Sequence, residues 1–188
     1  MRIIGGAVGG RRIRAPHGSG TRPTSDKVRG ALFNILGPPD ENVRVLDLFA
    51  GAGALGLEAL SRGAAKTVFV ERDSHALGAL RRNIRELGFE ERATVMGTEV
   101  GTALRRLAAS HSQFAWVFLD PPYKQEVEAV LGELGSSELL APCAVVVVEH
   151  DRRHRPPGSV CGSVGGLFLT DRRDYGDTEV SFYRGGRS

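Results

Sequence analysis

The sequence predicts an α/β fold with a doubly wound, mostly parallel sheet, and three observations support this. Short apolar runs alternate with segments of helical periodicity from residue 43 onward. The run at residues 144–148 is continuous and rich in valine, as in strands buried on both faces of a parallel sheet. Two further runs near the C-terminus follow each other with no helical segment between them. We therefore expect a seven-stranded sheet with an antiparallel edge strand.

Strands and helices are expected to alternate along the chain. The expected strands are residues 43–48, 67–70, 93–96, 116–119, 144–148, 167–170 and 180–183. The expected helices between them are residues 54–62, 74–87, 101–109 and 127–134. Gly63 and Gly88 stand where the first two of these helices end, as a residue that leaves the helical conformation should.

A basic segment precedes this pattern. Residues 1–30 hold seven lysines and arginines and one acid, whereas the whole chain of 188 residues has a net charge of +3. Glycine pairs at 5–6 and 9–10 allow a hairpin, and Thr24 or Ser25 can cap the helix that follows. We expect residues 1–39 to form a basic hairpin or arm with a helix that contacts a polyanionic substrate, and residues 40–188 to form the main domain. From charge alone, a solvated basic tail fits as well.

The remaining composition is that of an intracellular protein. The two cysteines form no CxxC pair, so zinc and redox motifs have no support and reduced thiols in the cytoplasm are expected. The N-terminus carries no apolar leader segment. The longest apolar run, residues 139–148, contains Pro142 and is too short to cross a bilayer. No membrane association and no metal site are expected.

Gly51, Gly53 and Gly56 follow the first expected strand at the spacing G-x-G-x-x-G. Between a strand and a helix, this spacing lets a ligand approach bare backbone beside a helix N-terminus. Glu71 closes the second expected strand, where a carboxylate can accept hydrogen bonds from both hydroxyls of a ribose. The loop therefore predicts a cofactor that contains a nucleoside.

Two cofactor classes fit this loop. A dinucleotide would place its pyrophosphate on the glycine turn, where a carboxylate at Asp47 would repel it. S-adenosylmethionine has no phosphate, carries a sulfonium charge and needs an acid near its amino group. Asp47 can be that acid, directly or through water. Asp47 and Glu71 together favour S-adenosylmethionine, although Asp47 also suits a structural role as a cap of loop N–H groups.

Asp120, Pro121, Pro122 and Tyr123 follow the fourth expected strand. Neither proline has a backbone N–H, and the first pushes Asp120 toward an extended backbone. The turn can therefore offer the Asp120 carboxylate and the Pro121 carbonyl as acceptors, and the Tyr123 ring as a flat face. These groups predict a receptor for a planar group that carries an NH₂, with a plain surface turn as the alternative.

Four stretches of the chain closely resemble the RsmD family of bacterial enzymes, which methylate N2 of one guanine in small-subunit ribosomal RNA. They are residues 22–29 (RPTSDKVR), 32–34 (LFN), 47–63 (DLFAGAGALGLEALSRG) and 120–123 (DPPY). The first and third are specific to the family, whereas the fourth is shared with other class I amino-methyltransferases. The resemblance runs from Arg2 to the expected closing strands and so covers nearly the whole chain.

The resemblance implies a class I, Rossmann-like methyltransferase fold with S-adenosylmethionine as cofactor, and makes residues 40–188 the catalytic domain. It implies that Asp120, Pro121, Pro122 and Tyr123 are catalytic. The residues that it places at the cofactor are Asp47, Phe49, Ala50, Gly51, Gly53, Glu71, Arg72, Gly97, Thr98 and Asp120. Glu99 stands where many relatives have an Asp or Asn that contacts the adenine amino group, with an ordinary surface glutamate as the alternative.

The resemblance also implies the substrate side. The residues that it places at the RNA are Arg11, Arg12, Arg14, Arg22, Thr24, Asp26 and Arg29. The implied partner is small-subunit ribosomal RNA within an assembling ribosomal subunit, bound by a monomer.

Three alternatives remain open at this stage. A class I enzyme with another amine target, adenine N6 or a protein glutamine, would need a target-recognition region or a helical N-terminal domain. A nucleotide-dependent oxidoreductase is disfavoured by Asp47 and gives the Asp120 turn no role. A non-catalytic RNA-binding module would carry a degraded glycine loop or turn, and both are intact in the sequence.

Overall fold

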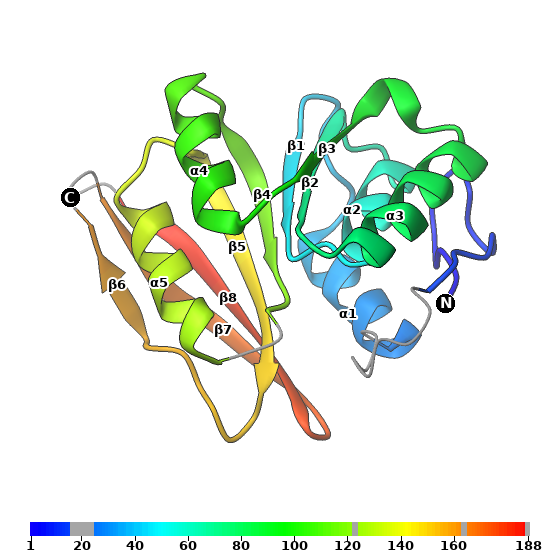
Figure 1. The fold of residues 1–188 in the computed structure, drawn as a ribbon. Coiled ribbons are helices and arrows are strands. Elements are labelled where there is room, and N and C mark those ends of the chain that lie inside the picture. The colour runs from blue at the N-terminus through cyan, green and yellow to red at the C-terminus, as the bar shows by residue number, and fades with distance from the viewer. Residues whose placement is uncertain (16–24, 122–123, 163–164, 187–188) are drawn as a thin grey trace. The chain divides into compact units, whose positions relative to one another are not determined.

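The computed structural model describes residues 1–15, 25–121, 124–162 and 165–186. Its chain divides into two units, Met1–Thr98 and Glu99–Ser188 (Figure 1). The proposed boundary between an arm at residues 1–39 and a main domain at residues 40–188 stays a prediction. Among the described residues, no helix combines the length and the apolar character needed to cross a membrane.

The first unit is a parallel three-stranded layer with helices. Its elements are α1 (Asp26–Leu36), β1 (Arg44–Leu48), α2 (Ala54–Ser61), β2 (Lys66–Glu71), α3 (Ser74–Leu87), the 3₁₀ turn η1 (Glu90–Arg92) and β3 (Ala93–Gly97). Strand β2 lies between β1 and β3 and is parallel to both. Helix α2 packs on β1 and β2, and α3 packs on β3 (Figure 1). The carboxyl ends of all three strands therefore meet at one edge.

The second unit combines a parallel pair with an antiparallel extension. Its elements are α4 (Val100–Ala109), β4 (Phe114–Leu119), α5 (Lys124–Gly135), β5 (Leu140–Asp151), β6 (Ser159–Cys161), β7 (Gly166–Tyr175) and β8 (Thr178–Gly186). Strands β4 and β5 are parallel, while β8 pairs antiparallel with both β5 and β7, and β6 pairs antiparallel with β7. Helix α5 packs against β5, β6 and β7 (Figure 1).

The alternation of strands and helices agrees with the sequence prediction, with two local differences. The described residues form eight strands rather than seven, because the three-residue β6 is too short to show an alternating pattern. Strand β5 begins earlier than expected and is irregular, since the pairing moves from Phe114↔Leu140 to Trp116↔Val145. Cys143 has a φ of 62° within this stretch, and the preceding Pro142 has no N–H to give to the sheet.

Local chemistry explains where the helices of the first unit begin and end. The Ser25 hydroxyl accepts the Val28 N–H at 3.2 Å, which selects Ser25 as the cap of α1. Asp73 caps α3 in the same way by accepting the Ala76 N–H at 2.8 Å. Gly88, with a φ of 76°, ends α3 in the left-handed conformation that glycine adopts without strain.

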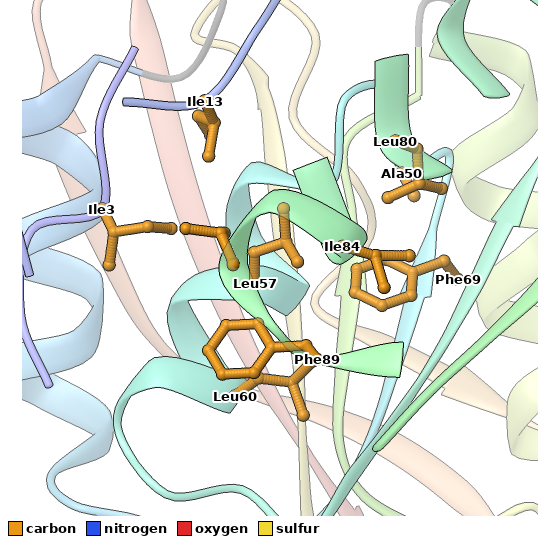
Figure 2. Packing of buried hydrophobic residues seen from close by; sticks show 10 residues of the cluster. Ile3, Ile13, Ala50, Leu57, Leu60, Phe69, Leu80, Ile84 and Phe89 are labelled. Atoms are coloured by element: carbon orange, nitrogen blue, oxygen red, sulfur yellow. The ribbon is translucent and has the colours of Figure 1, made fainter. Parts of the chain in front are cut away.

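The basic arm is docked on the body of the first unit rather than extended from it. Ile3 and Ile13 are 0% and 4% exposed and belong to one apolar cluster with Leu57 and Leu60 of α2 and Ile84 of α3 (Figure 2). A single antiparallel bridge joins Arg2 to Arg12, so the predicted hairpin forms with minimal pairing. Burial of two isoleucines contributes about 2–3 kcal/mol each, which suffices to hold the arm on the body.

Polar contacts add to this docking. The Glu58 carboxylate of α2 is fully buried and accepts the N–H groups of Ile4 at 2.6 Å and Gly5 at 2.9 Å. It also accepts the Arg62 Nε at 2.7 Å. The Ser61 hydroxyl donates to the Gly5 carbonyl at 2.6 Å. The backbone of the arm is thus bound to the same helix that carries the glycine loop at its N-terminus.

Candidate functional site

Asp47 is a buried acid at the carboxyl end of β1. Its side chain accepts the Gly56 N–H at 2.9 Å, so the sequence-based expectation of a loop-capping acid is confirmed. Burial, only partly offset by that hydrogen bond and reinforced by the nearby Glu71, raises the pKa of Asp47 to about 7. Near neutral pH, Asp47 is therefore poised between its neutral and charged forms. A charged group or donor placed beside it would shift that balance.

Glu71 organises the backbone at the end of β2. Its Oε2 accepts the Gly51 N–H at 2.8 Å, and its Oε1 accepts the N–H groups of Arg72 at 2.7 Å and Asp73 at 2.8 Å. Each carboxylate oxygen has two lone-pair sites, so Oε2 keeps capacity for a further donor. Glu71 is also the register partner of Gly97 at the end of β3. Predicted cofactor residues on neighbouring strands therefore lie at one edge.

The glycine loop turns through the left-handed region three times. The φ angles are 61° at Phe49, 54° at Gly51 and 85° at Gly53. Phe49 is not a glycine, so its conformation stores strain that the surrounding contacts must maintain, as often occurs at ligand sites. The Ala50 N–H is held by the Val70 carbonyl at 3.0 Å.

At two of the three glycines, neighbouring atoms leave no room for a Cβ. A Cβ on Gly56 would lie 2.3 Å from a ring carbon of Phe69 and 2.9 Å from Asp47 Oδ2. A Cβ on Gly53 would lie 2.4 Å from a methyl group of Leu80. A Cβ on Gly51 would meet no heavy atom within 4 Å, so Gly51 is the glycine of the three with free space above it. A ligand can therefore approach the loop at Gly51.

The donors and acceptors at this edge suit S-adenosylmethionine. Glu71 offers a free lone pair for a ribose hydroxyl. Gly53 has no side chain with which to cap α2, and Asp47 takes the Gly56 N–H, so the earlier N–H groups of the first turn are left for a carboxylate. Asp47 lies beside the loop, and its role as the acid for an ammonium group stays a prediction. Asp47 would repel a pyrophosphate less than the sequence suggested, because its raised pKa leaves the carboxyl partly neutral at pH 7.

The predicted adenine side follows β3. Gly97 is exposed, and Thr98 is half-buried with its N–H donating to the Met96 carbonyl at 3.1 Å. A Cβ on Gly97 would lie 3.2 Å from Leu77 and 3.9 Å from the Arg81 guanidinium. Glu99 is exposed and precedes α4 without capping it through its side chain, and Arg72 is exposed. Contact of these residues with a cofactor stays a prediction.

The second unit carries the turn that is predicted to hold the target amine. Asp120 and Pro121 directly follow β4 and are both half-buried. Leu119, the last residue of β4, pairs with Val148 of β5, so Asp120 leaves the sheet at the carboxyl edge of that parallel pair. Pro122 and Tyr123 lie outside the described residues, and their predicted roles are not addressed by the structure.

The predicted RNA residues divide by exposure. Arg11, Arg12 and Arg14 are exposed on the docked arm, as a phosphate-binding role requires. Arg29 is completely buried: its guanidinium donates to Asp26 Oδ1 at 2.9 Å and to the Arg2 carbonyl. In this structure Arg29 and Asp26 therefore join α1 to the arm, and their contact with RNA stays a prediction. Arg22 and Thr24 lie outside the described residues.

Asn83 of α3 is a residue that the sequence analysis missed. It is 1% exposed and binds the arm at both backbone groups of Arg14, accepting its N–H at 2.8 Å and donating to its carbonyl at 3.0 Å. It also donates to the Ala52 carbonyl in the glycine loop at 2.9 Å. One side chain thus links the arm to the loop. A buried polar residue on the apolar face of α3 was the signal available in the sequence.

Comparisons with known proteins converge on one group. A family model described as conserved hypothetical protein 95 matches residues 1–184. The Bacillus subtilis protein YlbH is 40% identical over 185 residues, which is 98% of either chain. Ribosomal RNA small subunit methyltransferase D of Escherichia coli is 38% identical over 152 residues, covering 80% of this chain and 75% of that protein. The solved structure of yhhF from Escherichia coli, described as a methyltransferase, gives a TM-score of 0.83 at 32% identity and covers 98% of this chain and 97% of its own.

Proposed function

Since the chain belongs to the RsmD family, whose model is described as conserved hypothetical protein 95, we propose that it methylates N2 of a guanine in small-subunit ribosomal RNA. Membership makes the chain an S-adenosylmethionine-dependent methyltransferase with a class I fold. The identity of the methylated atom is the part of this proposal that goes beyond the family relationship and requires its own test.

The arrangement of Asp47 and Glu71 around the glycine loop is the observation that supports the proposal most strongly. Glu71 holds the Gly51 N–H and keeps a lone pair for a ribose hydroxyl, and Asp47 lies beside the loop as the acid for an ammonium group. We propose that Phe49, Ala50 and Gly53 line the methionine part of the cofactor and that Gly97, Thr98 and Arg72 flank its nucleoside. When bound, S-adenosylmethionine supplies a methyl group activated by a sulfonium charge.

The amino group of guanine is a weak nucleophile because its lone pair is delocalised into the ring. We propose that the Asp120 carboxylate and the Pro121 carbonyl accept its two N–H bonds and so direct the lone pair toward the methyl group. Tyr123 would stack on the base, which must first leave its surroundings. Asp120 and Pro121 would hold the amine nitrogen so that its new bond to the methyl group replaces the methyl–sulfur bond, and the amine would then lose a proton. Positioning and electrostatics supply most of the acceleration.

Asp120 does not need to act as a strong base in this scheme. The proton becomes acidic only after the nitrogen has gained the methyl group, so Asp120 or water can take it late. The role of Asp120 is then to accept a hydrogen bond from an N–H, which an amide oxygen can also do.

We further propose where and on what the enzyme works. Arg11, Arg12 and Arg14 contact phosphates, which would make binding sensitive to salt. Arg29 and Asp26 hold the arm that presents them, and Arg22 and Thr24 also contribute to RNA binding. The substrate is an assembling small ribosomal subunit in the cytoplasm, and the enzyme acts as a monomer.

Transfer of labelled methyl from S-adenosylmethionine to small ribosomal subunits tests the proposal. The subunits come from cells that lack this protein, and free 16S RNA is assayed in parallel. After digestion to nucleosides, label in N2-methylguanosine is expected, with more label from subunits than from free RNA. Label in N6-methyladenosine or in protein glutamine would move the target to one of the alternative amines. Absence of label in the presence of measured cofactor binding would refute an RNA substrate.

A further inference from the structure

Two arginines of the first unit bind the Glu86 carboxylate at the surface, a third binds the Glu86 backbone, and a fourth is the neighbour of Glu86 in sequence. Arg11 and Arg14 come from the arm, and Arg82 and Arg85 come from α3, which also supplies Glu86. We call this set the Glu86 cluster. The Arg14 Nη2 lies 3.3 Å from Glu86 Oε1, and the Arg82 Nε lies 2.9 Å from the same oxygen. Arg11 donates to the Glu86 backbone carbonyl.

The charges of the Glu86 cluster do not balance. The set contains one carboxylate and four guanidinium groups, two of them in contact with the carboxylate, so its net charge is +3. Arg82 and Arg14 together hold the pKa of Glu86 below its usual range, chiefly through the hydrogen bond from Arg82. Arg85 forms no ion pair within the part of the chain that the structure describes. The cluster therefore retains unneutralised positive charge that is open to solvent.

A purely structural role explains this arrangement poorly. The side chains of Arg14, Arg82 and Glu86 are 55%, 57% and 39% exposed, and exposed ion pairs typically stabilise a fold by less than about 1 kcal/mol each. Burial of Ile3 and Ile13 already docks the arm. Guanidinium forks matched to oxyanions are instead the usual protein device for binding phosphate.

Three exposed arginines just after β5 and in β7 provide an internal contrast. Arg153 pairs with Asp151 at 2.7 Å, and Arg173 pairs with Asp171 at 2.8 Å. Arg152 lies 3.8 Å from Asp174. Each of these arginines has its own acid, so that surface offers little net charge to a polyanion. The Glu86 cluster has an excess of cations instead.

The Glu86 cluster is also connected to the cofactor loop. The backbone of Arg14 is bound at both its N–H and its carbonyl by Asn83, which donates to the Ala52 carbonyl as well. Asn83 is adjacent to Arg82 in α3. One intervening residue, Asn83, thus separates the charged surface from the glycine loop. The charged surface and the glycine loop therefore share one buried side chain as a contact.

We propose that the arm and α3 form one phosphate-binding surface for the RNA backbone, with Arg82 and Arg85 as contacts beside those of the arm. This inference rests on the proposed function, since it takes RNA as the substrate. Glu86 orients Arg14 and Arg82, but it also places one negative charge in the proposed phosphate-binding surface. Contacts of this kind fix the position of the RNA and carry no base specificity.

Two matched double variants test the surface. Arg82→Gln with Arg85→Gln removes two charges from α3, and Arg105→Gln with Arg106→Gln removes two exposed charges from α4. The dissociation constant for a small-subunit RNA fragment is measured at several salt concentrations, with cofactor affinity measured in parallel. The α3 variant should bind RNA roughly ten-fold more weakly at 0.1 M salt, and the slope of log K against log salt should fall by about 2. The α4 variant should remain within about two-fold of wild type.

A third variant should bind RNA more tightly than wild type. Glu86→Gln removes the negative charge, so RNA should bind several-fold more tightly while cofactor affinity stays unchanged. Equal RNA affinity for the α3 and α4 variants would overturn the proposal, as would unchanged or weaker RNA binding by Glu86→Gln. If the α3 variant also lost cofactor affinity, the RNA affinity of Glu86→Gln would decide whether this surface binds the RNA backbone. Failure of the proposed function has a different signature: wild type would bind RNA through α3 but transfer no methyl group to it.

Discussion

Replacement of Asp47 by asparagine should stabilise the fold at high pH. Burial raises the pKa of Asp47 from 3.8 to about 7, so the folded state holds the proton more tightly than the unfolded state. Each pKa unit corresponds to about 1.4 kcal/mol, which gives an ionisation cost of about 4 kcal/mol above pH 7. Asparagine cannot ionise, and its amide oxygen can still accept the Gly56 N–H. The variant avoids this cost.

The pH dependence identifies the cause. For a group whose folded pKa is raised in this direction, stability falls as pH rises from about 4 to about 7 and is level above. At pH 5 the cost in wild type is only about 1.5–2 kcal/mol, because Asp47 is still protonated in the folded state and ionises only in the unfolded state. The advantage of Asp47→Asn should therefore grow by about 2–3 kcal/mol between pH 5 and pH 8, whatever constant offset the amide adds.

Urea unfolding of both proteins at pH 5, 6, 7 and 8 measures this difference directly, since every other titrating group contributes equally to both. Cofactor affinity is the matching readout: it should fall for wild type below pH 7 and be weak for the variant at every pH. A stability difference that stays constant across the range would show that the pKa of Asp47 is not raised and would refute the reasoning.

Three further substitutions probe the arm and the loop. Gly6→Ala should destabilise the protein by about 1–3 kcal/mol and expose the arm to protease, because its φ is 78° and the new Cβ would lie 2.0 Å from the Ser61 carbonyl oxygen. Asn83→Asp keeps the acceptor but loses the donors to the Ala52 carbonyl, so cofactor affinity should fall about ten-fold and amide exchange in the arm should accelerate. Equal exchange in both proteins would contradict a link between the arm and the loop through Asn83. Glu71→Gln should weaken cofactor binding at least ten-fold in calorimetry while the far-ultraviolet circular dichroism stays native, and unchanged affinity would exclude a ribose contact.

The sequence predicted the order of the elements because local patterns determine them. The valine run of β5, the helical spacing of α3 and the terminating Gly88 are all short-range signals. Helix α3 was predicted at its observed bounds for this reason. The short strand β6 and the irregular start of β5 were missed, since three residues are too few for a periodic pattern and Pro142 interrupts the pairing.

Long-range contacts could not be predicted in this way. Glu58 binds the arm backbone across 54 positions of sequence, and Asn83 binds Arg14 across 69. Nothing in the local pattern shows which amide a buried acid or amide will meet. The arm illustrates the consequence: its charge fits either a hairpin that contacts a polyanion or a solvated tail, whereas the burial of Ile3 and Ile13 on the first unit follows only from packing.

The positions of the predicted site residues differ from their environments in the same respect, and their roles stay predictions. Motif spacing placed Asp47, Glu71 and Gly51 correctly at the edge where β1 and β2 end. Spacing alone does not give the environment of a carboxyl group, so the raised pKa of Asp47 and the complete burial of Arg29 emerged only from packing.

The central claim is that the chain methylates an exocyclic guanine amine that Asp120 holds as a hydrogen-bond acceptor. The most direct measurement is single-turnover transfer of labelled methyl to small ribosomal subunits by wild type, Asp120→Asn and Asp120→Ala, followed by nucleoside analysis. The account predicts label in N2-methylguanosine, largely retained with asparagine and reduced by a factor of about 10²–10³ with alanine, the typical loss for one positioned hydrogen-bonding group. Label in another nucleoside, or full activity of Asp120→Ala, would contradict it.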